Sequence, residues 1–322
     1  MSSNYKLDFT GKTCLVTGGA GFIGSNLARS LVKLGADVKI IDNFSTGKRR
    51  NIYDFKKMGI EIFNLDITNE EETEFCYNSL DFVFHHAAIA SVPYSVKFPE
   101  KSRSNNVGGI ISVLRNSSKM GIDKVVFASS SSVYGDTDEV PTGEKVKLSP
   151  QSPYARQKRE GELLCKDYSK SNKIKTTSLR YFNVFGPYQD PDSEYSAVIP
   201  KFIKSAIDNE DLLIFGDGSS TRDFVFVEDV IQSNLLSVFL ESSDCEEINI
   251  AGGQKITISN LAKLIIEVTG SKSQVVHVRP RNGDILHSVA DITKANEILG
   301  YNPHFSLEEG LLKTVEYFKR SN

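Results

Sequence analysis

The stretch TCLVTGGAGFIGSNLA, residues 13–28, predicts a buried strand that turns through glycines into a helix. Gly18, Gly21 and Gly24 recur at three-residue spacing where the strand ends. Such glycines allow a tight turn, let backbone N–H groups approach a pyrophosphate, and let the helix pack closely on the strand. We therefore expect this turn to bind a dinucleotide.

The alternation of strand and helix continues through the first half of the chain. Short apolar runs predict buried parallel strands, and the amphipathic segments between them predict helices. Together they favour an α/β fold with a Rossmann-type doubly wound parallel sheet. The expected strands are 13–17, 38–42, 60–66, 82–88, 124–130 and 175–184, and the expected helices are 22–35, 106–121 and 153–170.

The pattern changes after residue 185. Segment 186–197, GPYQDPDSEYSA, is rich in Pro, Asp and Ser, which predicts a loop. We therefore expect a dinucleotide-binding domain over residues 1–185, with a returning segment near 222–240, and a smaller C-terminal α/β substrate lobe over 186–322. In this lobe the expected strands are 212–216, 246–251 and 274–280, and the expected helices are 198–208, 258–270 and 306–319.

Composition argues against several classes of protein. The 322 residues are 39% hydrophobic and 25% charged with a formal net charge of −3, so there is no basic excess to hold nucleic acid or an anionic membrane. The N-terminus lacks the apolar core of a signal peptide, and no run approaches the roughly 20 apolar residues of a membrane span. We expect a cytoplasmic protein.

Cysteines and histidines give no metal-ligand pattern. The four cysteines are scattered, without a C-x-x-C pair, so we expect reduced core thiols. His85 and His86 close an apolar strand and have no third ligand at useful spacing. We expect no metal site.

Asp42 ends the strand that follows the first helix. A carboxylate at this place can accept hydrogen bonds from an adenosine ribose, and it would repel a 2′-phosphate. The sequence therefore favours NAD over NADP as the dinucleotide.

A second group of polar residues suggests proton transfer. Ser152 and Pro153 predict the start of a helix, on which Tyr154 and Lys158 share one face. We expect the ammonium, the helix N-terminus and the positive nicotinamide to lower the pKa of the phenol toward neutrality, which would make Tyr154 a base. Ser130 ends the strand 124–130, where a parallel sheet meets its ligand crevice, and its hydroxyl could bind a substrate oxygen.

The combined motifs resemble the extended short-chain dehydrogenase/reductase superfamily, in its UDP-hexose 4-epimerase branch, and most of all the UDP-N-acetylglucosamine 4-epimerases. The resemblance implies bound NAD, a UDP-sugar bound by the lobe 186–322, and a homodimer. It rests on Asp42, on Tyr154-x-x-x-Lys158, and on TGGAGFIGSN (17–26), SSSSVYG (129–135), LRYFNVFGP (179–187), AVIPKFI (197–203), GDGSSTRDFVFVEDV (216–230) and RPRNGDILHSVAD (279–291).

The resemblance assigns roles by position. It implies that Tyr154 is the catalytic base, that Lys158 activates it and binds the nicotinamide ribose, and that Ser130 is their hydroxyl partner. The implied cofactor contacts are Gly18, Gly21, Phe22, Ile23, Gly24, Asp42, Asn43, Ser45, Thr46, Gly47, Asp66, Ile67, Ala87, Ala88, Ala90, Asn106, Ser129, Tyr154, Lys158, Tyr181, Asn183 and Val184. The implied substrate contacts are Ala90, Ser91, Ser130, Tyr154, Asn183, Ala197, Val198, Phe215, Arg222, Arg281, Asp284 and Ser288.

The reaction expected within this family is 4-epimerisation through a transient 4-keto sugar. Related dehydratases and decarboxylases carry acidic residues at the positions of Ser131 and Ser132, and a hydroxyl is a poor proton shuttle. Small Ser288 leaves room for a 2-acetamido group, which favours UDP-N-acetylglucosamine. UDP-glucose/UDP-galactose and UDP-(N-acetyl)uronic acid remain alternatives, as do a net nucleotide-sugar oxidoreductase or dehydratase and a non-catalytic NAD-binding regulator.

Overall fold

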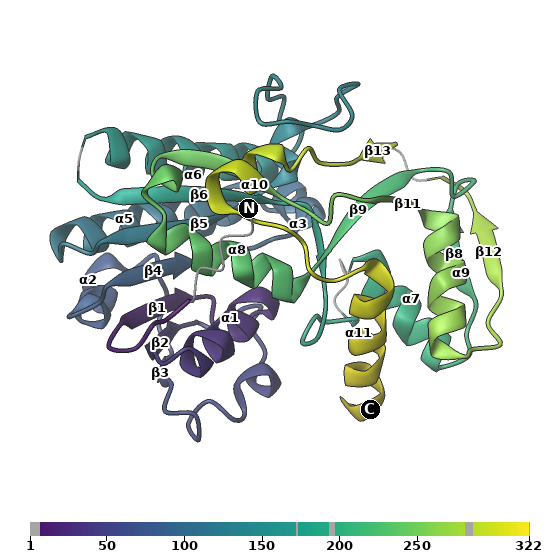
Figure 1. Cartoon of the computed structure of the whole chain (residues 1–322), viewed down its shortest axis with the longest axis horizontal. Helices are drawn as coiled ribbons and strands as arrows, with labels where there is room; N and C mark the ends of the chain where they lie inside the picture. The colour runs from purple at the N-terminus through teal and green to yellow at the C-terminus, as the bar shows by residue number, and fades with distance from the viewer. Residues whose placement is uncertain (1–6, 172, 193–196, 281–285, 322) are drawn as a thin grey trace.

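The computed structural model describes residues 7–171, 173–192, 197–280 and 286–321. In this part of the chain seven strands form one sheet in the order β10-β6-β5-β4-β1-β2-β3, and every neighbouring pair is parallel. The strand order reverses between β1 and β4, as in a doubly wound sheet. The expected Rossmann-type α/β fold is confirmed (Figure 1).

The strands of the main sheet overlap the expected segments, but those expected over 60–66 and 82–88 are shorter in the structure. The strand expected over 175–184 divides, and its last residues join a separate strand over Asn183–Phe185 in another sheet. The strands of the main sheet are β1 (Thr13–Thr17), β2 (Asp37–Ile41), β3 (Glu61–Phe63), β4 (Phe82–His85), β5 (Lys124–Ser130), β6 (Lys175–Tyr181) and β10 (Glu246–Ile250). The flanking helices and turns are α1 (Phe22–Lys33), η1 (Arg49–Ile52), α2 (Glu70–Thr73), η2 (Glu74–Tyr77), α3 (Val92–Lys97), α4 (Pro99–Arg103), the π-helical turn η3 (Ser104–Gly108), α5 (Gly109–Lys119), η4 (Ser131–Tyr134), α6 (Pro153–Lys170), α8 (Val227–Phe239), η5 (Glu241–Ser243) and α10 (Thr293–Leu299).

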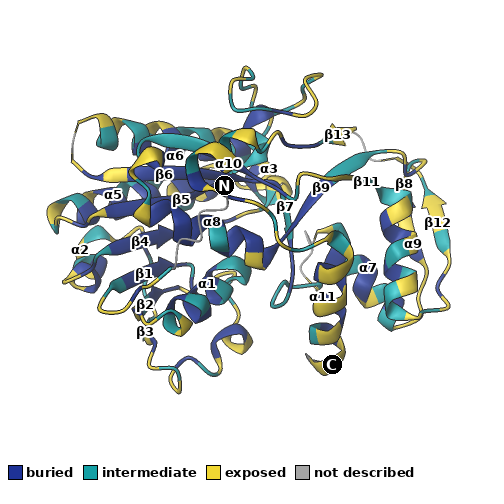
Figure 2. Cartoon of the chain, viewed as in Figure 1, coloured by how far each residue is buried: buried dark blue, intermediate teal, exposed yellow. Residues whose placement is uncertain are grey.

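Helices cover both faces of this sheet, so its strands are buried on both sides (Figure 2). On β1, Val16 packs in the cluster that contains Leu27 of α1, whereas its neighbour Leu15 packs in the cluster that contains Val113 of α5. Alternate side chains of one strand point to opposite faces. Continuous apolar runs in the sequence therefore indicate buried strands here.

The rest of the chain builds smaller sheets beside the main one (Figure 1). In one of them β9 pairs in parallel with β7 and β13 and antiparallel with β11, and in another β8 pairs in parallel with β12. Helices α7, α9 and α11 pack against one another next to these strands. The bounds are β7 (Asn183–Phe185), α7 (Val198–Ile207), β8 (Leu212–Phe215), β9 (Thr221–Phe226), β11 (Lys255–Thr257), α9 (Ile258–Thr269), β12 (Val275–Val278), β13 (His287–Ser288) and α11 (Leu307–Ser321).

One expected strand lies in a different sheet from the one we predicted. The strand predicted over 246–251 was assigned to the smaller lobe, but β10 pairs in parallel with β6 at the edge of the main sheet. Helix α8, which lies within the expected returning segment, packs against β5 and β6 and carries the chain back to this edge. A parallel pair needs such a crossover, and sequence position alone does not reveal it. The boundary between the two lobes stays a prediction.

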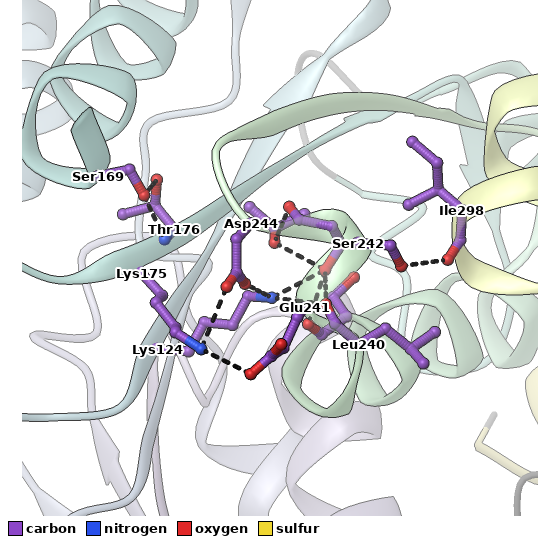
Figure 3. Close-up of polar contacts among 12 residues, drawn as sticks. Lys124, Ser169, Lys175, Thr176, Leu240, Glu241, Ser242, Asp244 and Ile298 are labelled. Carbon is purple, nitrogen blue, oxygen red and sulfur yellow. Dashed lines mark hydrogen bonds and ion pairs between the residues drawn. The ribbon is translucent and has the colours of Figure 1, made fainter. Parts of the chain in front are cut away.

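A buried lysine joins the amino end of β5 to the segment between α8 and β10 (Figure 3). The Nζ of Lys124, which is 2% exposed, donates to the Ser243 hydroxyl at 2.8 Å, to an Asp244 carboxylate oxygen at 2.5 Å and to the Leu240 carbonyl at 3.2 Å. Half-exposed Lys175 contacts the same carboxylate at 3.3 Å. Lys124 and Lys175 therefore share Asp244 as a partner, but only Lys124 is buried.

This difference in burial predicts unequal effects on stability. Lys124→Met should lower the free energy of unfolding by about 3 kcal/mol, because it removes the buried cation and leaves Asp244 with the exposed Lys175 as its partner. Lys175→Met should cost less than about 1 kcal/mol, as exposed pairs do. Urea unfolding of both variants beside the parent protein checks this. Equal losses in the two variants would contradict it.

Candidate active site

The glycine turn after β1 forms the floor of the site. Gly18 has a φ of +70°, and a Cβ added to it would lie 2.6 Å from the backbone nitrogen of Ala87. A Cβ on Gly24, in the first turn of α1, would lie 2.3 Å from the Gly18 carbonyl oxygen. Gly21 is the N-cap of α1 and offers no side chain to the first helical N–H groups. The turn therefore presents bare backbone where a pyrophosphate would lie.

A cavity of about 820 Å³ opens above this turn, at the carboxyl ends of the strands. Its lining contains most of the residues expected to bind the cofactor: Gly18, Gly21, Phe22, Ile23, Gly24, Asp42, Asn43, Ser45, Thr46, Ile67, Ala87, Ala88, Ala90, Ser129, Tyr154, Lys158 and Tyr181. The structure therefore brings together expected cofactor residues that are up to 163 residues apart in the sequence, from Gly18 to Tyr181.

Asp42 is buried beside the glycine turn. Its carboxylate accepts hydrogen bonds from the backbone N–H groups of Ala20 at 2.9 Å and Phe44 at 2.8 Å. Burial raises the pKa of this carboxyl group, and the two N–H groups oppose that shift. Gly47 packs against it, since a Cβ there would lie 2.6 Å from an Asp42 oxygen. The backbone thus fixes this carboxylate at the place where a ribose diol is expected.

Other expected cofactor residues lie outside the described lining of this cavity. Asp66 lines an adjacent cavity of about 760 Å³ and accepts a hydrogen bond from Asn43 at 2.9 Å. Asn183 and Val184 lie on β7, and the Asn183 amide donates to the Asp223 carbonyl at 3.0 Å. Their contacts with a cofactor stay predictions.

The side chain of Asn106, an expected cofactor contact, forms hydrogen bonds within the protein. This side chain exchanges hydrogen bonds with the backbone of Ile89 and donates to the Gln157 side chain at 2.7 Å. It thereby holds the loop after β4 against α6. The neighbouring Asn105 lines both cavities instead, and sequence spacing cannot choose between the two because they lie in a π-helical turn.

Helix α6 begins where the sequence predicts. The Ser152 hydroxyl caps it by accepting a hydrogen bond from the Ala155 N–H at 3.1 Å, and Pro153 is its first residue. The Lys158 Nζ donates to the Ala128 carbonyl at 2.6 Å and lies 5.8 Å from the centre of the Tyr154 ring. The Tyr154 phenol shares a hydrogen bond with Ser130. The three expected catalytic residues therefore lie together.

The protein by itself does not lower the pKa of the Tyr154 phenol. Burial raises the pKa of the Tyr154 phenol to about 12, and the hydrogen bond from Ser130 opposes this shift without cancelling it. Burial also lowers the pKa of Lys158 to about 8. The protein alone thus keeps the phenol protonated at neutral pH, because the loss of solvent outweighs the hydrogen bond from Ser130. The expected lowering of the Tyr154 pKa requires the further positive charge of the dinucleotide.

His86 also lines the cavity, and the sequence reading missed it as a site residue. Its ring stacks on that of Tyr181, with the two planes 8° apart. Burial, with the charge of Lys158, lowers the pKa of His86 to about 3, and an Asn234 hydrogen bond opposes this shift. His85 bonds the Thr17 hydroxyl at 2.7 Å, and burial lowers its pKa as well. Neutral rings serve here as packing groups.

A basic segment was also missed. Lys48, Arg49 and Arg50 line the cavity, and Asp190 contacts the Lys48 ammonium at 3.2 Å and the Arg50 guanidinium at 3.0 Å. The run KRR, which directly follows the expected cofactor residue Gly47, could have indicated this basic part of the cavity. The remaining lining residues that we had not predicted are Ile41, Asn51, Leu65, Asn105, Ala128, Tyr188, Asp190 and Asp192.

The expected substrate residues come from several elements. Ala90 and Ser91 line the 760 Å³ cavity, and the Ser91 hydroxyl caps α3 by accepting a hydrogen bond from the Tyr94 N–H at 3.1 Å. Arg222 on β9 and Ser288 on β13 are register partners. Ala197 is the N-cap of α7 and Val198 its first residue, while Phe215 ends β8. Arg281 and Asp284 lie outside the described residues.

In the described part of the chain no cluster of three or more His, Cys, Asp or Glu side chains could hold a metal ion. None of the described helices is long and apolar enough to cross a membrane. All four cysteines are free; Cys14, Cys76 and Cys165 are buried as expected, whereas Cys245 is partly exposed.

The chain is similar to known proteins over most of its length. The model of the NAD dependent epimerase/dehydratase family matches residues 14–251. A curated protein of Methanocaldococcus jannaschii, "Putative UDP-glucose 4-epimerase", is 37% identical over 310 residues, or 96% of this chain and 99% of that protein. A Bacillus cytotoxicus protein, "UDP-N-acetyl-alpha-D-glucosaminuronate decarboxylase", is 36% identical over 322 residues, or 96% of this chain and 98% of that protein.

Solved structures give the same fold. The UDP-N-acetylglucosamine 4-epimerase from Methanobrevibacter ruminantium M1 in complex with UDP-N-acetylmuramic acid has a TM-score of 0.92 to this chain at 38% sequence identity. The match covers 97% of this chain and 99% of that chain. The similarity therefore includes both the main sheet and the smaller sheets beside it.

Proposed function

This chain belongs to the NAD dependent epimerase/dehydratase family, and we propose that it is an NAD-dependent 4-epimerase that interconverts UDP-N-acetylglucosamine and UDP-N-acetylgalactosamine. The observation that carries the proposal is the contact between Tyr154 and Ser130 beside Lys158, with hydroxyls rather than carboxylates at 131 and 132. Such a group can move one proton at the sugar without a second acid nearby.

The residues present fit NAD. Gly18 and Gly24 leave bare backbone for the pyrophosphate, and Asp42 lies in the same cavity to receive the ribose hydroxyls. Asp42 also disfavours a 2′-phosphate by charge. Bound NAD supplies the acceptor for the C4 hydride and, once reduced, its donor.

The protein side of the reaction is a proton transfer at the C4 oxygen. Tyr154, ionised to the phenolate, would take the hydroxyl proton as the C4–H bond breaks, which leaves a 4-keto sugar and a neutral phenol. The phenol would return that proton when hydride adds to the opposite face. Ser130 holds the C4 oxygen and the phenol in one hydrogen-bonded group. Lys158 places its positive charge beside the phenol, which favours the phenolate during the transfer. The sugar must turn over between the two steps for its configuration to invert.

The choice of sugar rests on small residues. Ser288 on β13 is the register partner of Arg222 on β9, and its small side chain would leave room for a 2-acetamido group if it lies beside the sugar. The related epimerase in complex with UDP-N-acetylmuramic acid supports an N-acetylated substrate. UDP-glucose is the second candidate, because the M. jannaschii relative carries that name. An N-acetylated uronic acid is a third, given the decarboxylase among the relatives.

Incubation of the purified protein with a panel of UDP-sugars, without added cofactor, tests the proposal. We expect isomers of unchanged mass, fastest for UDP-N-acetylglucosamine, when the products are separated by chromatography. Net loss of water or carbon dioxide, or consumption of added NAD(P)H in proportion to product, would contradict an epimerase.

Ser288→Tyr tests the sugar pocket directly. A ring at this position should crowd the 2-acetamido group and lower kcat/KM for UDP-N-acetylglucosamine relative to UDP-glucose by at least ~10-fold, the effect of about 1.4 kcal/mol of steric discrimination. Initial rates with both sugars give the ratio. An unchanged ratio would remove Ser288 from the pocket.

We also propose that the enzyme acts as a cytoplasmic homodimer. Val92 and Val96 of α3 and Leu163 of α6 are large apolar side chains at least 41% exposed, and the two helices contact each other. A second copy could cover this surface. The four free cysteines support a reducing compartment.

A further inference from the structure

Helix α6 presents three polar side chains at four-residue spacing to the end of β5. Tyr154 bonds with Ser130, and Lys158 donates to the carbonyl of Ala128. Glu162, the third, accepts a 2.6 Å hydrogen bond from the Ser129 hydroxyl. The proposed reaction uses the first two contacts and leaves Glu162 without a role.

Glu162 is fully buried and held by cations. Arg180 on β6 donates to it through Nε at 2.8 Å and Nη2 at 2.9 Å, a bidentate pair, and Arg159 adds a third bond at 2.9 Å. The pKa of Glu162 is lowered: burial opposes this, but the bonds and charge of Arg180 prevail. Arg180 is also the register partner of Ser129. One ion pair therefore joins α6, β5 and β6 next to the cavity.

The same arginine reaches toward the smaller lobe. Its Nη1 donates to the Tyr134 hydroxyl at 3.0 Å, which donates to the Asn249 amide oxygen at 2.6 Å on β10. The Asn249 amide nitrogen then donates to the backbone carbonyls of Thr142 at 2.9 Å and Asp291 at 3.2 Å. Asp291 lies three residues beyond Ser288. The hydrogen bonds thus run from the catalytic helix to the segment that follows β13.

We propose that Glu162 and Arg180 are positioning residues for the epimerisation, which hold Tyr154 and Lys158 in register with Ser130 by fixing helix α6 to the end of β5 through Ser129. The inference rests on the proposed function. Buried ion pairs contribute little net stability compared with well-packed apolar side chains, whereas a pair with every bond satisfied fixes one geometry. Catalytic groups need such support, because small displacements slow proton transfer.

Glu162 also acts on Lys158 through its charge. Its carboxylate favours the ammonium, against the burial that lowers the pKa of Lys158 to about 8. The removal of this charge should lower that pKa further, so that the ammonium is lost at a lower pH. The titratable and charged groups around Lys158 are Tyr154, Glu162 and Cys165 on its own helix, His85 and His86 at the end of β4, and Arg180 and Tyr181 on β6.

The test compares Glu162→Gln and Ser129→Ala with Glu247→Gln. Glu247 makes a matched control, because its carboxylate contacts Arg159 at 3.6 Å and Lys166 of α6 at 3.3 Å, whereas the Ser129 hydroxyl donates to Glu162. We expect Glu162→Gln to lower kcat at least ~10-fold, with KM and NAD affinity within ~2-fold of the parent. We also expect the alkaline limb of its kcat–pH profile to move to lower pH. Glu247→Gln should leave both unchanged.

Ser129→Ala removes the hydrogen bond between β5 and Glu162 but keeps the Glu162–Arg180 ion pair. It therefore tests the proposal even if Glu162→Gln does not fold. Its kcat at saturating NAD should fall ~3-fold or more, while the bonds from Arg159 and Arg180 to Glu162 keep the variant folded. If Glu162→Gln and Ser129→Ala both fold and lose only Tm, while kcat and its pH profile stay at the parental values, the proposal is wrong.

Crystal structures of these variants with NAD give a readout that does not depend on the substrate. A displaced Tyr154 phenol, no longer bonded to Ser130, would support positioning, and an unmoved phenol would oppose it. If the parent protein converts none of the UDP-sugars, the proposed function fails while this structural arm still judges the role of Glu162.

Discussion

Tyr154→Phe is expected to lower kcat for epimerisation by at least ~10²-fold, the effect of losing a positioned general base. Phenylalanine keeps the ring beside Lys158 and removes the hydroxyl that bonds with Ser130. Binding of NAD and UDP should therefore be unchanged. Rate measurements with UDP-N-acetylglucosamine, beside calorimetric titration with UDP and NAD, separate the two effects.

Tyr168→Phe provides the matched control for this experiment. Tyr168 lies on the same helix, outside the described lining of the cavity, and its loss removes a phenol without touching the proposed chemistry. Its kcat should equal that of the parent. Near-normal turnover in Tyr154→Phe would reject Tyr154 as the base.

The second large effect is expected at the glycine turn. Gly24→Ala would place a methyl group 2.3 Å from the Gly18 carbonyl oxygen, a contact that only a backbone shift can relieve. Overpacking of this kind costs about 1–3 kcal/mol, and at its upper end NAD affinity should fall ~10²-fold. Alanine favours a helix over glycine, so helix propensity cannot cause the loss. Titration with NAD, followed by intrinsic tyrosine fluorescence, measures it.

Gly143→Ala is the control for the glycine experiment. A Cβ at Gly143 would lie no closer than 3.7 Å to Asp291 and meet no backbone atom. Its NAD affinity should match that of the parent. If Gly24→Ala retained parental NAD affinity, the turn would not be the dinucleotide site.

Much of the site could be predicted from local sequence because its chemistry depends on short spacings. Gly18, Gly21 and Gly24 lie within one turn, and Tyr154 and Lys158 lie on one helix that begins at a Ser-Pro cap. Near neighbours in the chain have fixed geometry once their element is known. These residues line the cavity as expected.

Contacts between distant segments could not be predicted from the sequence in this way. Asp190 lies about 140 residues from the basic segment it contacts, and Glu162 binds an arginine on another strand. Neither follows from periodicity, since both depend on which elements become neighbours when the sheet forms. At Asn106 the prediction differs from the structure by one residue, because in the π-helical turn it is Asn105 that lines the cavity.

The sequence by itself determined the parallel α/β sheet, the dinucleotide turn and the pairing of Tyr154 with Lys158, because apolar periodicity and helical spacing act over a few residues. Tertiary structure alone decided that β10 joins the main sheet, that Lys124 and Glu162 are buried with their partners, and that burial raises the pKa of Tyr154. Burial and strand pairing depend on the whole packed chain. A pKa that depends on lost solvent therefore cannot be read from neighbours in the sequence.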